Sequence, residues 1–232
     1  MMPKKYEHLF FDLDRTLYDF ENNNRQTLSD LFCNHRLESL GVDCFDSFYQ
    51  TYKTINYGLW QRYKNQEITK EYLNQTRFEQ TLGAFQISNG LAAVFASEYI
   101  TNSPLQTKVL PGTFEILDYL SGKYVLHIIT NGFEEIQYQK LSSCGITEYF
   151  KEIITSEAAG VQKPHQAIFR HAMKVTGATP ALSLIIGDDP ESDILGGQQF
   201  NMDQVWLKQP GEASDIVPTY CIGSLMELKE IL

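Results

Sequence analysis

The sequence predicts an α/β fold in which a helical insert interrupts a doubly wound parallel sheet. The apolar run at 8–11 is short and directly precedes acidic residues, which is typical of a buried strand. From Val109 onward, strand-like and helix-like patterns alternate, which favours parallel strands joined by helices. We therefore expect a core domain formed by 1–16 and 108–232 and an inserted helical cap at 17–107.

Apolar residues recur at helical spacing throughout the insert, and no convincing strand interrupts them. This pattern predicts four helices, at about Leu28–Leu40, Phe48–Leu59, Thr69–Leu82 and Leu91–Tyr99. An insert of about 90 residues falls within the usual size range of a small domain.

The core is expected to continue as a series of strands and helices. The predicted strands are 124–129, 153–154, 182–186, 204–207 and 219–222. The predicted helices are 113–120, 134–143, 164–175 (with Pro164 in the first turn), 193–200 and a terminal helix through Ile231.

Composition limits the classes of partner. A net charge of −10 argues against a nucleic-acid polymer or an anionic membrane as partner. The four cysteines form no Cys-x-x-Cys pair, so neither a zinc site nor a disulfide framework is indicated. There is no apolar run of roughly 20 residues and no signal-peptide pattern, so we expect a cytoplasmic protein.

Two acids follow the first predicted strand. In an extended backbone Asp12 and Asp14 point to the same side, at the sheet edge where open α/β folds bind ligands. Their mutual repulsion favours a cation between them, and Mg²⁺ prefers such oxygen ligands. Taken alone, the pair could equally open a polar turn.

Three further clusters stand at predicted strand or loop ends. Thr130-Asn131-Gly132 could bind phosphate through a hydroxyl and helix-start N–H groups, and Lys163 could reach a phosphate or a carboxylate. Further metal oxygens are offered by Asp188, Asp189 and Asp193. Each cluster alone is readily explained as a turn, a solvated lysine or an acidic surface loop. Their joint occurrence in this order is hard to reach by chance.

These four motifs resemble those of haloacid dehalogenase superfamily hydrolases with an inserted helical cap. Asp-Leu-Asp-Arg-Thr-Leu at 12–17 resembles the first motif, Thr130-Asn131-Gly132 the second, Lys163-Pro164 the third, and 187–193 the fourth. The resemblance implies a phosphatase in which Asp12 is the nucleophile and forms an aspartyl phosphate, while Asp14 is the general acid and base.

The same resemblance implies the remaining roles. Thr130, Asn131 and Lys163 would bind the phosphate. Mg²⁺ would be held by Asp12, the Asp14 backbone carbonyl and Asp188, with Asp189 and Asp193 in an outer shell. These roles agree with the chemistry, because a carboxylate attacking a phosphate dianion needs nearby positive charge. An acid at position 14 argues against a dehalogenase, since a halide leaving group needs no proton.

The expected cap resembles that of the pyrimidine nucleoside 5′-monophosphatase branch, in the segments Asn56-Tyr57-Gly58-Leu59-Trp60 and Arg77-Phe78-Glu79. Trp60 could then stack on a base, and Asn56 or Arg77 could bond its edge or the ribose of a nucleoside monophosphate. The alternative is that Trp60 belongs to the cap core and Arg77 pairs with an acid such as Glu79.

Other functions are compatible with some or all of these motifs. A general small-metabolite or sugar-phosphate phosphatase and a phosphomutase would use the same core motifs. A non-enzymatic receiver-type switch also combines acids, a Thr and a Lys, but a receiver is shorter and carries no cap.

Overall fold

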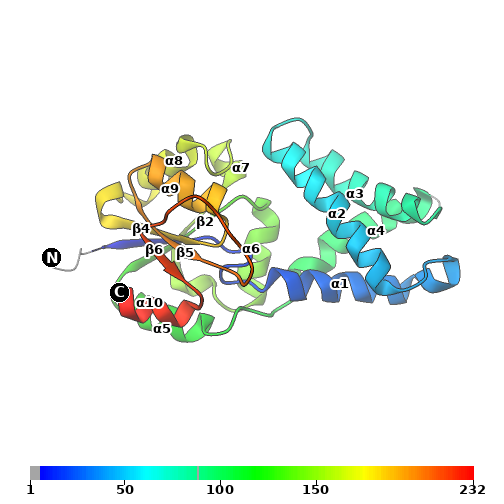
Figure 1. Ribbon diagram of the computed structural model, residues 1–232, viewed down its shortest axis with the longest axis horizontal. Helices are drawn as coiled ribbons and strands as arrows, with labels where there is room; N and C mark the ends of the chain where they lie inside the picture. Colours follow the sequence, from blue (N-terminus) through cyan, green and yellow to red (C-terminus); the bar gives the residue numbers. More distant parts are fainter. Residues whose placement is uncertain (1–5, 88) are drawn as a thin grey trace. The chain divides into compact units, whose positions relative to one another are not determined.

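The computed structural model describes residues 6–87 and 89–232. The chain divides into two compact units. One is formed by the described residues of Met1–Phe20 together with Thr107–Leu232, and the other by those of Glu21–Gln106. The first unit contains the sheet, and the second is helical (Figure 1).

A six-stranded sheet with the order β3-β2-β1-β4-β5-β6 forms the centre of the first unit, and all its neighbouring strands pair in parallel. The strands are β1 His8–Phe11, β2 Val125–Thr130, β3 Phe150–Thr155, β4 Ser183–Gly187, β5 Asp203–Leu207 and β6 Tyr220–Ile222. The predicted parallel α/β sheet is thus confirmed. The strand order reverses at β1, and such switch points are where α/β sheets bind ligands.

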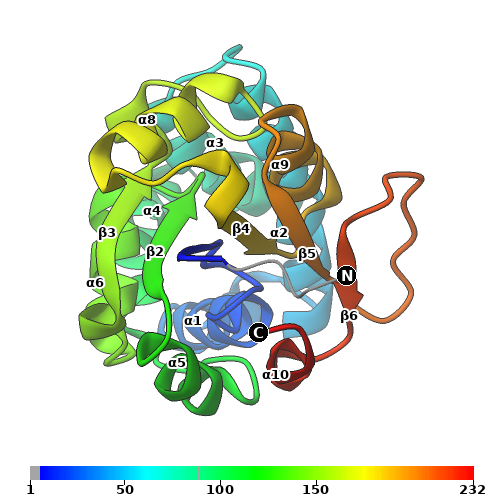
Figure 2. The same ribbon diagram turned by 90° about the vertical axis from the view of Figure 1, so that its left-hand side faces the viewer.

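Helices cover both faces of this sheet, as Figure 2 shows for α8 and α9 on one side and α5 and α10 on the other. Side chains alternate along β1, so Leu9 and Phe11 join one buried cluster while Phe10 joins the other. The core helices are α5 Thr113–Ser121, α6 Glu134–Ser143, α7 Ser156–Ala159, α8 Gln166–Thr176, α9 Leu195–Gln199 and α10 Leu228–Ile231.

Two helix boundaries differ from the prediction for an identifiable local reason. Helix α8 begins at Gln166, beyond Pro164, because the His165 side chain caps it by accepting a hydrogen bond from the Ala167 N–H. The first helix of the insert ends at Asn34 rather than near Leu40, because Arg36 adopts a left-handed backbone conformation (φ 51°). A short 3₁₀ turn, Leu37–Leu40, follows.

The helical unit has its own apolar core. Its main helices are α1 Phe20–Asn34, α2 Phe45–Lys64, α3 Lys70–Ala84 and α4 Asn89–Asn102. Phe48, Phe78 and Phe95 are fully buried in its centre, with the Phe95 ring 6.1 Å from Phe48 and 5.8 Å from Phe78. Within residues 6–87 and 89–232, no helix combines the length and apolar character that crossing a bilayer requires.

The chain leaves the first unit and returns to it along a short ladder. Tyr18 and Val109 form an antiparallel bridge, and the Asp19 N–H donates to the Lys108 carbonyl oxygen at 3.1 Å. The two ends of the insert are therefore hydrogen-bonded neighbours, close to the turn that follows β1.

Candidate active site

The site begins at the carboxyl end of β1. The Asp12 N–H donates to the carbonyl oxygen of Ile186 on β4 at 2.9 Å, so the backbone of Asp12 is still fixed to the sheet. Arg15 then adopts a left-handed conformation (φ 65°), and the chain turns back so that the Arg15 N–H reaches the Tyr18 carbonyl oxygen. This turn presents Asp12 and Asp14 beyond the strand end.

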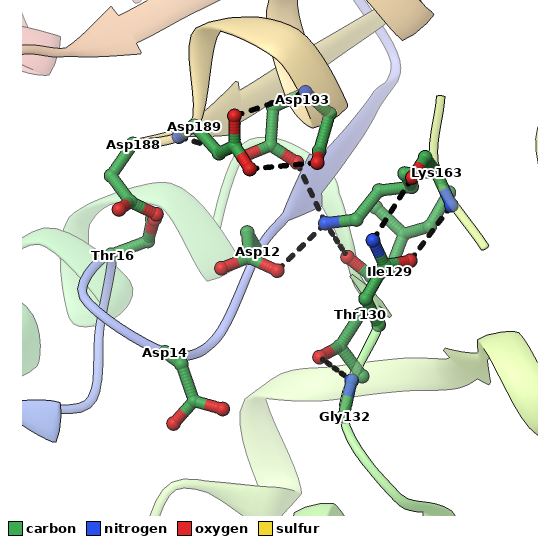
Figure 3. A network of polar contacts seen from close by, with 12 residues as sticks. Asp12, Asp14, Thr16, Ile129, Thr130, Gly132, Lys163, Asp188, Asp189 and Asp193 are labelled. Carbon is green, nitrogen blue, oxygen red and sulfur yellow. Dashed lines mark hydrogen bonds and ion pairs between the residues drawn. The ribbon is translucent and has the colours of Figure 1, made fainter. Parts of the chain in front are cut away.

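Lys163 lies at the centre of the site (Figure 3). Its Nζ donates to Asp12 Oδ1 at 2.7 Å, to Asp193 Oδ1 at 2.6 Å and to the Ile129 carbonyl oxygen at 2.7 Å. An ammonium has three N–H donors, so these three acceptors use all of them. Burial alone would lower the pKa of Lys163, but the charges of Asp12 and Asp193 reverse this and raise it. Lys163 is therefore a fixed positive charge.

The loop that carries Lys163 is held by Asn131. The Asn131 amide donates to the Lys163 carbonyl oxygen at 3.0 Å, and its oxygen accepts from the Lys163 N–H at 2.7 Å. The hydroxyl of buried Thr130 accepts from the Gly132 N–H at 3.1 Å. The Asn131 side chain thus joins the end of β2 to the loop before α8.

The predicted acidic cluster comes together beside Lys163. One carboxylate oxygen from each of Asp12, Asp188 and Asp193 lies within 4.8 Å of the other two, and all three residues are buried. Asp188 is fixed by the Thr16 hydroxyl, which donates to its Oδ1 at 3.3 Å, and by the Trp206 indole N–H, which donates to its carbonyl oxygen at 2.9 Å.

Asp189 and Gly187 shape this loop. The Asp189 carboxylate caps the turn that follows, where it accepts from the N–H groups of Glu191 and Ser192. A Cβ on Gly187 would lie 2.2 Å from Asp193 Oδ2, so only glycine leaves room for the Asp193 carboxylate.

Negative charge is in excess at this cluster. The pKa of Asp12 is raised to about 7, mainly by burial, with Lys163 opposing the shift and Asp193 adding to it. Burial and the charges of Asp12 and Asp193 likewise raise the pKa of Asp188. Buried, hard carboxylate oxygens that lack a matching positive charge suit Mg²⁺, so the residues present fit that ion.

Asp14 has partners that sequence reasoning missed. Gln137 Nε2 donates to Asp14 Oδ2 at 3.0 Å, and Lys140 Nζ donates to Oδ1 at 2.5 Å. Both residues lie on α6, three positions apart, and both are almost fully buried. The signal in the sequence is a pair of polar residues on the buried face of the helix that follows Thr130-Asn131-Gly132.

Of the predicted substrate residues, Arg77 lies on α3 and is only 4% exposed. Its guanidinium stands 4.5 Å from the centre of the Tyr99 ring and donates to Asn74 Oδ1 at 2.8 Å. The Glu79 carboxylate, offered above as a partner, accepts from Gln75.

Asn56 and Trp60 lie one turn apart on α2, and both are partly buried. The Trp60 ring meets the Tyr63 ring edge-on, with 5.6 Å between centroids. These residues and Arg77 belong to the helical unit, and their contact with substrate stays a prediction.

Comparisons with known proteins agree with this geometry. The family described as haloacid dehalogenase-like hydrolase matches residues 9–207. The pyrimidine 5′-nucleotidase YjjG of Escherichia coli (strain K12) is 32% identical, over 98% of each chain. The pyrimidine 5′-nucleotidase PynA of Streptococcus pneumoniae (strain ATCC BAA-255 / R6) is 30% identical, over 98% of this chain and 95% of the relative.

A solved structure is similar along its whole length. The crystal structure of YfnB from Bacillus subtilis, bound to magnesium, superposes with a TM-score of 0.86 at 31% identity, covering 98% of this chain and 99% of that one. The resemblance inferred from the four motifs is thereby confirmed. The chain belongs to the haloacid dehalogenase-like hydrolase family, among relatives that include pyrimidine 5′-nucleotidases.

Proposed function

We propose that this chain is a Mg²⁺-dependent phosphomonoester hydrolase that acts through an aspartyl phosphate on Asp12, with a nucleoside 5′-monophosphate as substrate. The names of two relatives, both pyrimidine 5′-nucleotidases about 30% identical, support the substrate class. The magnesium in the YfnB crystal structure supports the metal.

One observation carries the proposal: three buried carboxylates lie close together, and the Lys163 ammonium beside them bonds to only two of the three. Such a cluster is costly to bury unless a further cation compensates it. Asp12, the Asp14 backbone carbonyl and Asp188 would hold Mg²⁺ directly. Asp189 and Asp193 would lie in an outer shell around the ion. When bound, the ion supplies positive charge that lowers the repulsion between a carboxylate and a phosphate.

In the first step, an Asp12 carboxylate oxygen attacks the phosphorus, and the bond from phosphorus to the ester oxygen breaks. Asp14 gives its proton to the departing oxygen, as a poor leaving group requires. The Thr130 hydroxyl and the Asn131 backbone N–H would bind the phosphoryl oxygens. The Lys163 ammonium, whose three N–H groups are already engaged, would attract them through its charge. The Asn131 side chain is already engaged with the Lys163 backbone.

In the second step, water attacks the phosphorus of the aspartyl phosphate, and Asp14 accepts a proton from that water. The bond from phosphorus to the Asp12 oxygen breaks, which releases inorganic phosphate and restores the Asp12 carboxylate. Two displacements replace one difficult hydrolysis, and one residue serves as acid and then as base.

Recognition of the nucleoside is assigned to Asn56, Trp60 and Arg77. Asn56 Oδ1 and Arg77 Nε are buried and have no hydrogen-bond partner within the described part of the chain. Buried polar atoms are normally paired, so these atoms support a ligand that pairs them. The Tyr52 hydroxyl of the same unit is likewise buried and unpaired among the described residues. Trp60, one turn beyond Asn56 on α2, offers a ring on which a base could stack.

The decisive experiment is phosphate release from a panel of nucleoside 5′-monophosphates and sugar phosphates, each with Mg²⁺ and with EDTA. We expect Mg²⁺-dependent release, with the highest kcat/KM on a pyrimidine nucleotide. A preference for a triose phosphate would instead favour the activity named for a relative in Pyrococcus furiosus, a glyceraldehyde 3-phosphate phosphatase that is 26% identical. Full activity in EDTA would contradict the metal site.

A further inference from the structure

We propose that Gln137 and Lys140 are positioning residues that hold the Asp14 carboxylate in place for proton transfer. This inference rests on the proposed function, because it gives a role to two side chains that contact the acid and base. Neither residue belongs to the four motifs from which the site was predicted.

The two side chains divide the carboxylate between them. Gln137 Nε2 bonds to one Asp14 oxygen at 3.0 Å, and Lys140 Nζ bonds to the other at 2.5 Å. Gln137 is 1% exposed and Lys140 5%, whereas the Asp14 side chain is 27% exposed. The donors are therefore fixed within the protein, and the carboxylate they bond remains open to a reactant.

Aromatic rings hold the Lys140 ammonium. Its Nζ lies 4.7 Å from the centre of the Tyr18 ring and 5.3 Å from that of Phe20. Both rings come from the segment that follows Asp14 directly, so the turn carrying the acid also carries the rings that place its partner. Lys140 therefore behaves as part of the site rather than as a solvated surface lysine.

Gly132 makes space for Gln137. A Cβ on Gly132 would lie 1.7 Å from Gln137 Nε2 and 2.5 Å from its Cδ. The backbone of Gly132 does not need glycine for its φ angle, so the requirement is room for this side chain. The glycine of Thr130-Asn131-Gly132 thus links the expected phosphate-binding loop to the residue that holds the acid and base.

Orientation matters here because a general acid must stand within hydrogen-bond reach of the oxygen it protonates, roughly 2.6–3.2 Å between heavy atoms. A partly exposed carboxylate on a turn can occupy several rotamers. Two buried donors, one on each oxygen, select one of them before substrate arrives. This orientation should raise the rate of the step that needs the proton, and should not change substrate binding.

The test compares two leaving groups. Gln137→Met and Lys140→Met remove one donor each at nearly constant volume, and Gln139→Met is the matched control, since Gln139 is an exposed residue of the same helix. For a nucleoside 5′-monophosphate, we expect both donor variants to lower kcat by roughly 10- to 100-fold with KM little changed. For p-nitrophenyl phosphate, whose leaving group needs no proton, the loss should be much smaller. Lys140→Arg should restore most of the activity.

Two further variants separate positioning from structure. In an Asp14→Asn background, Lys140→Met should lower kcat little further, because the side chain that Lys140 positions can no longer transfer a proton. Gly132→Ala should displace the Gln137 amide and so reproduce the leaving-group pattern of Gln137→Met. In a Gln137→Ala background, Gly132→Ala should lower kcat less than it does in the wild type.

The possible outcomes distinguish this inference from the proposed function. A wild-type chain that hydrolyses no phosphate ester would overturn both. An active wild type whose Gln137→Met and Lys140→Met variants lose activity equally on both esters would overturn the positioning role alone. So would a full, additive loss for Lys140→Met in the Asp14→Asn background.

Discussion

The ammonium of Lys163 lies 2.7 Å from Asp12 Oδ1, and both groups are buried at the carboxyl end of β1. The contact joins the third sequence motif to the first across the sheet. Because the same ammonium also bonds Asp193, Lys163 neutralises part of the acidic cluster before any metal binds. The stability of the metal-free protein should therefore depend on these charges in a predictable direction.

Removing the cation and removing an acid should have opposite effects on stability. Lys163→Met leaves buried carboxylates unpaired and should lower the free energy of unfolding by about 3–5 kcal/mol. Asp188→Asn removes one of the excess charges, while its amide oxygen can still accept from Thr16, and should raise the melting temperature in EDTA at pH 8. Thermal unfolding of the two variants beside wild type measures both. A fall for Asp188→Asn as large as that for Lys163→Met would show that the cluster is not short of positive charge.

The raised pKa of Asp12 predicts a pH dependence with a definite sign. The folded protein keeps this proton up to about pH 7, whereas the unfolded chain loses it near its ordinary pKa of 3.8. Between those values the folded state binds more protons, so stability should fall as the pH rises and then level off above about pH 7. Melting temperatures in EDTA across pH 4 to 8 test this, and Asp12→Asn should flatten the decline. An unchanged slope in Asp12→Asn would assign the effect to other groups.

Magnesium binding should be detectable by the fluorescence of Trp206, because the Trp206 indole N–H donates to the carbonyl oxygen of Asp188. We expect Mg²⁺ to change the emission of this buried indole in a saturable titration, and EDTA to reverse the change. The variant Trp60→Phe leaves Trp206 as the single tryptophan and removes the signal of the other unit. Retention of the full response in Asp188→Asn would mean that the ion binds elsewhere.

The two acids of the first motif should differ in what they control. Asp12→Asn should reduce turnover of every phosphate ester by roughly 10³-fold or more, since no aspartyl phosphate can form. Asp14→Asn should reduce it most for esters with poor leaving groups. Rapid-quench detection of the phosphorylated enzyme, with both p-nitrophenyl and nucleotide esters, distinguishes the roles. Normal phosphoenzyme formation in Asp12→Asn would exclude it as the nucleophile.

Substitutions in the helical unit should change selectivity. Trp60→Ala and Arg77→Ala should lower kcat/KM for a good nucleotide by roughly 10- to 100-fold, or about 1–3 kcal/mol, and affect p-nitrophenyl phosphate much less. Tyr57→Ala, at an exposed position on the same helix as Trp60, is the matched control.

Because Arg77 is buried between aromatic rings, the melting temperature of the Arg77→Ala variant must be measured alongside its kinetics. Equal losses on both substrates, together with a large fall in melting temperature, would identify these two residues as core of the helical unit. The nucleoside assignment would then lose its support from this chain's own residues.

The sheet could be predicted because each strand is indicated by a short stretch of neighbouring residues. Buried parallel strands read as short apolar runs, and the polar residues after them mark the end where ligands bind. The edge strand β3 was recognised only at 153–154, because Lys151 and Glu152 interrupt its apolar pattern. Helix α8 was placed too early because proline is common in a first turn, whereas here the His165 cap begins the helix.

The contacts within the site were harder to predict, since their partners lie far apart in the sequence. Nothing near Lys140 indicates that its ammonium meets a carboxylate 126 positions earlier. Asn131 likewise reads as a turn residue, although its side chain bonds the backbone of Lys163 in both directions. Such pairings depend on which strand ends become neighbours, and the strand order is a property of the whole fold.

The hydrogen bond from the Asp19 N–H to the Lys108 carbonyl oxygen has an evolutionary consequence. Where the chain leaves the sheet-containing unit, it also comes back, so everything between these two residues is topologically a single long loop. A gene that gained, shortened or exchanged this stretch would leave the crossing points, and the reacting groups beyond them, in place. Lineages with one inherited set of reacting groups could thus acquire new substrates by replacing an insert, with no substitution in the sheet itself.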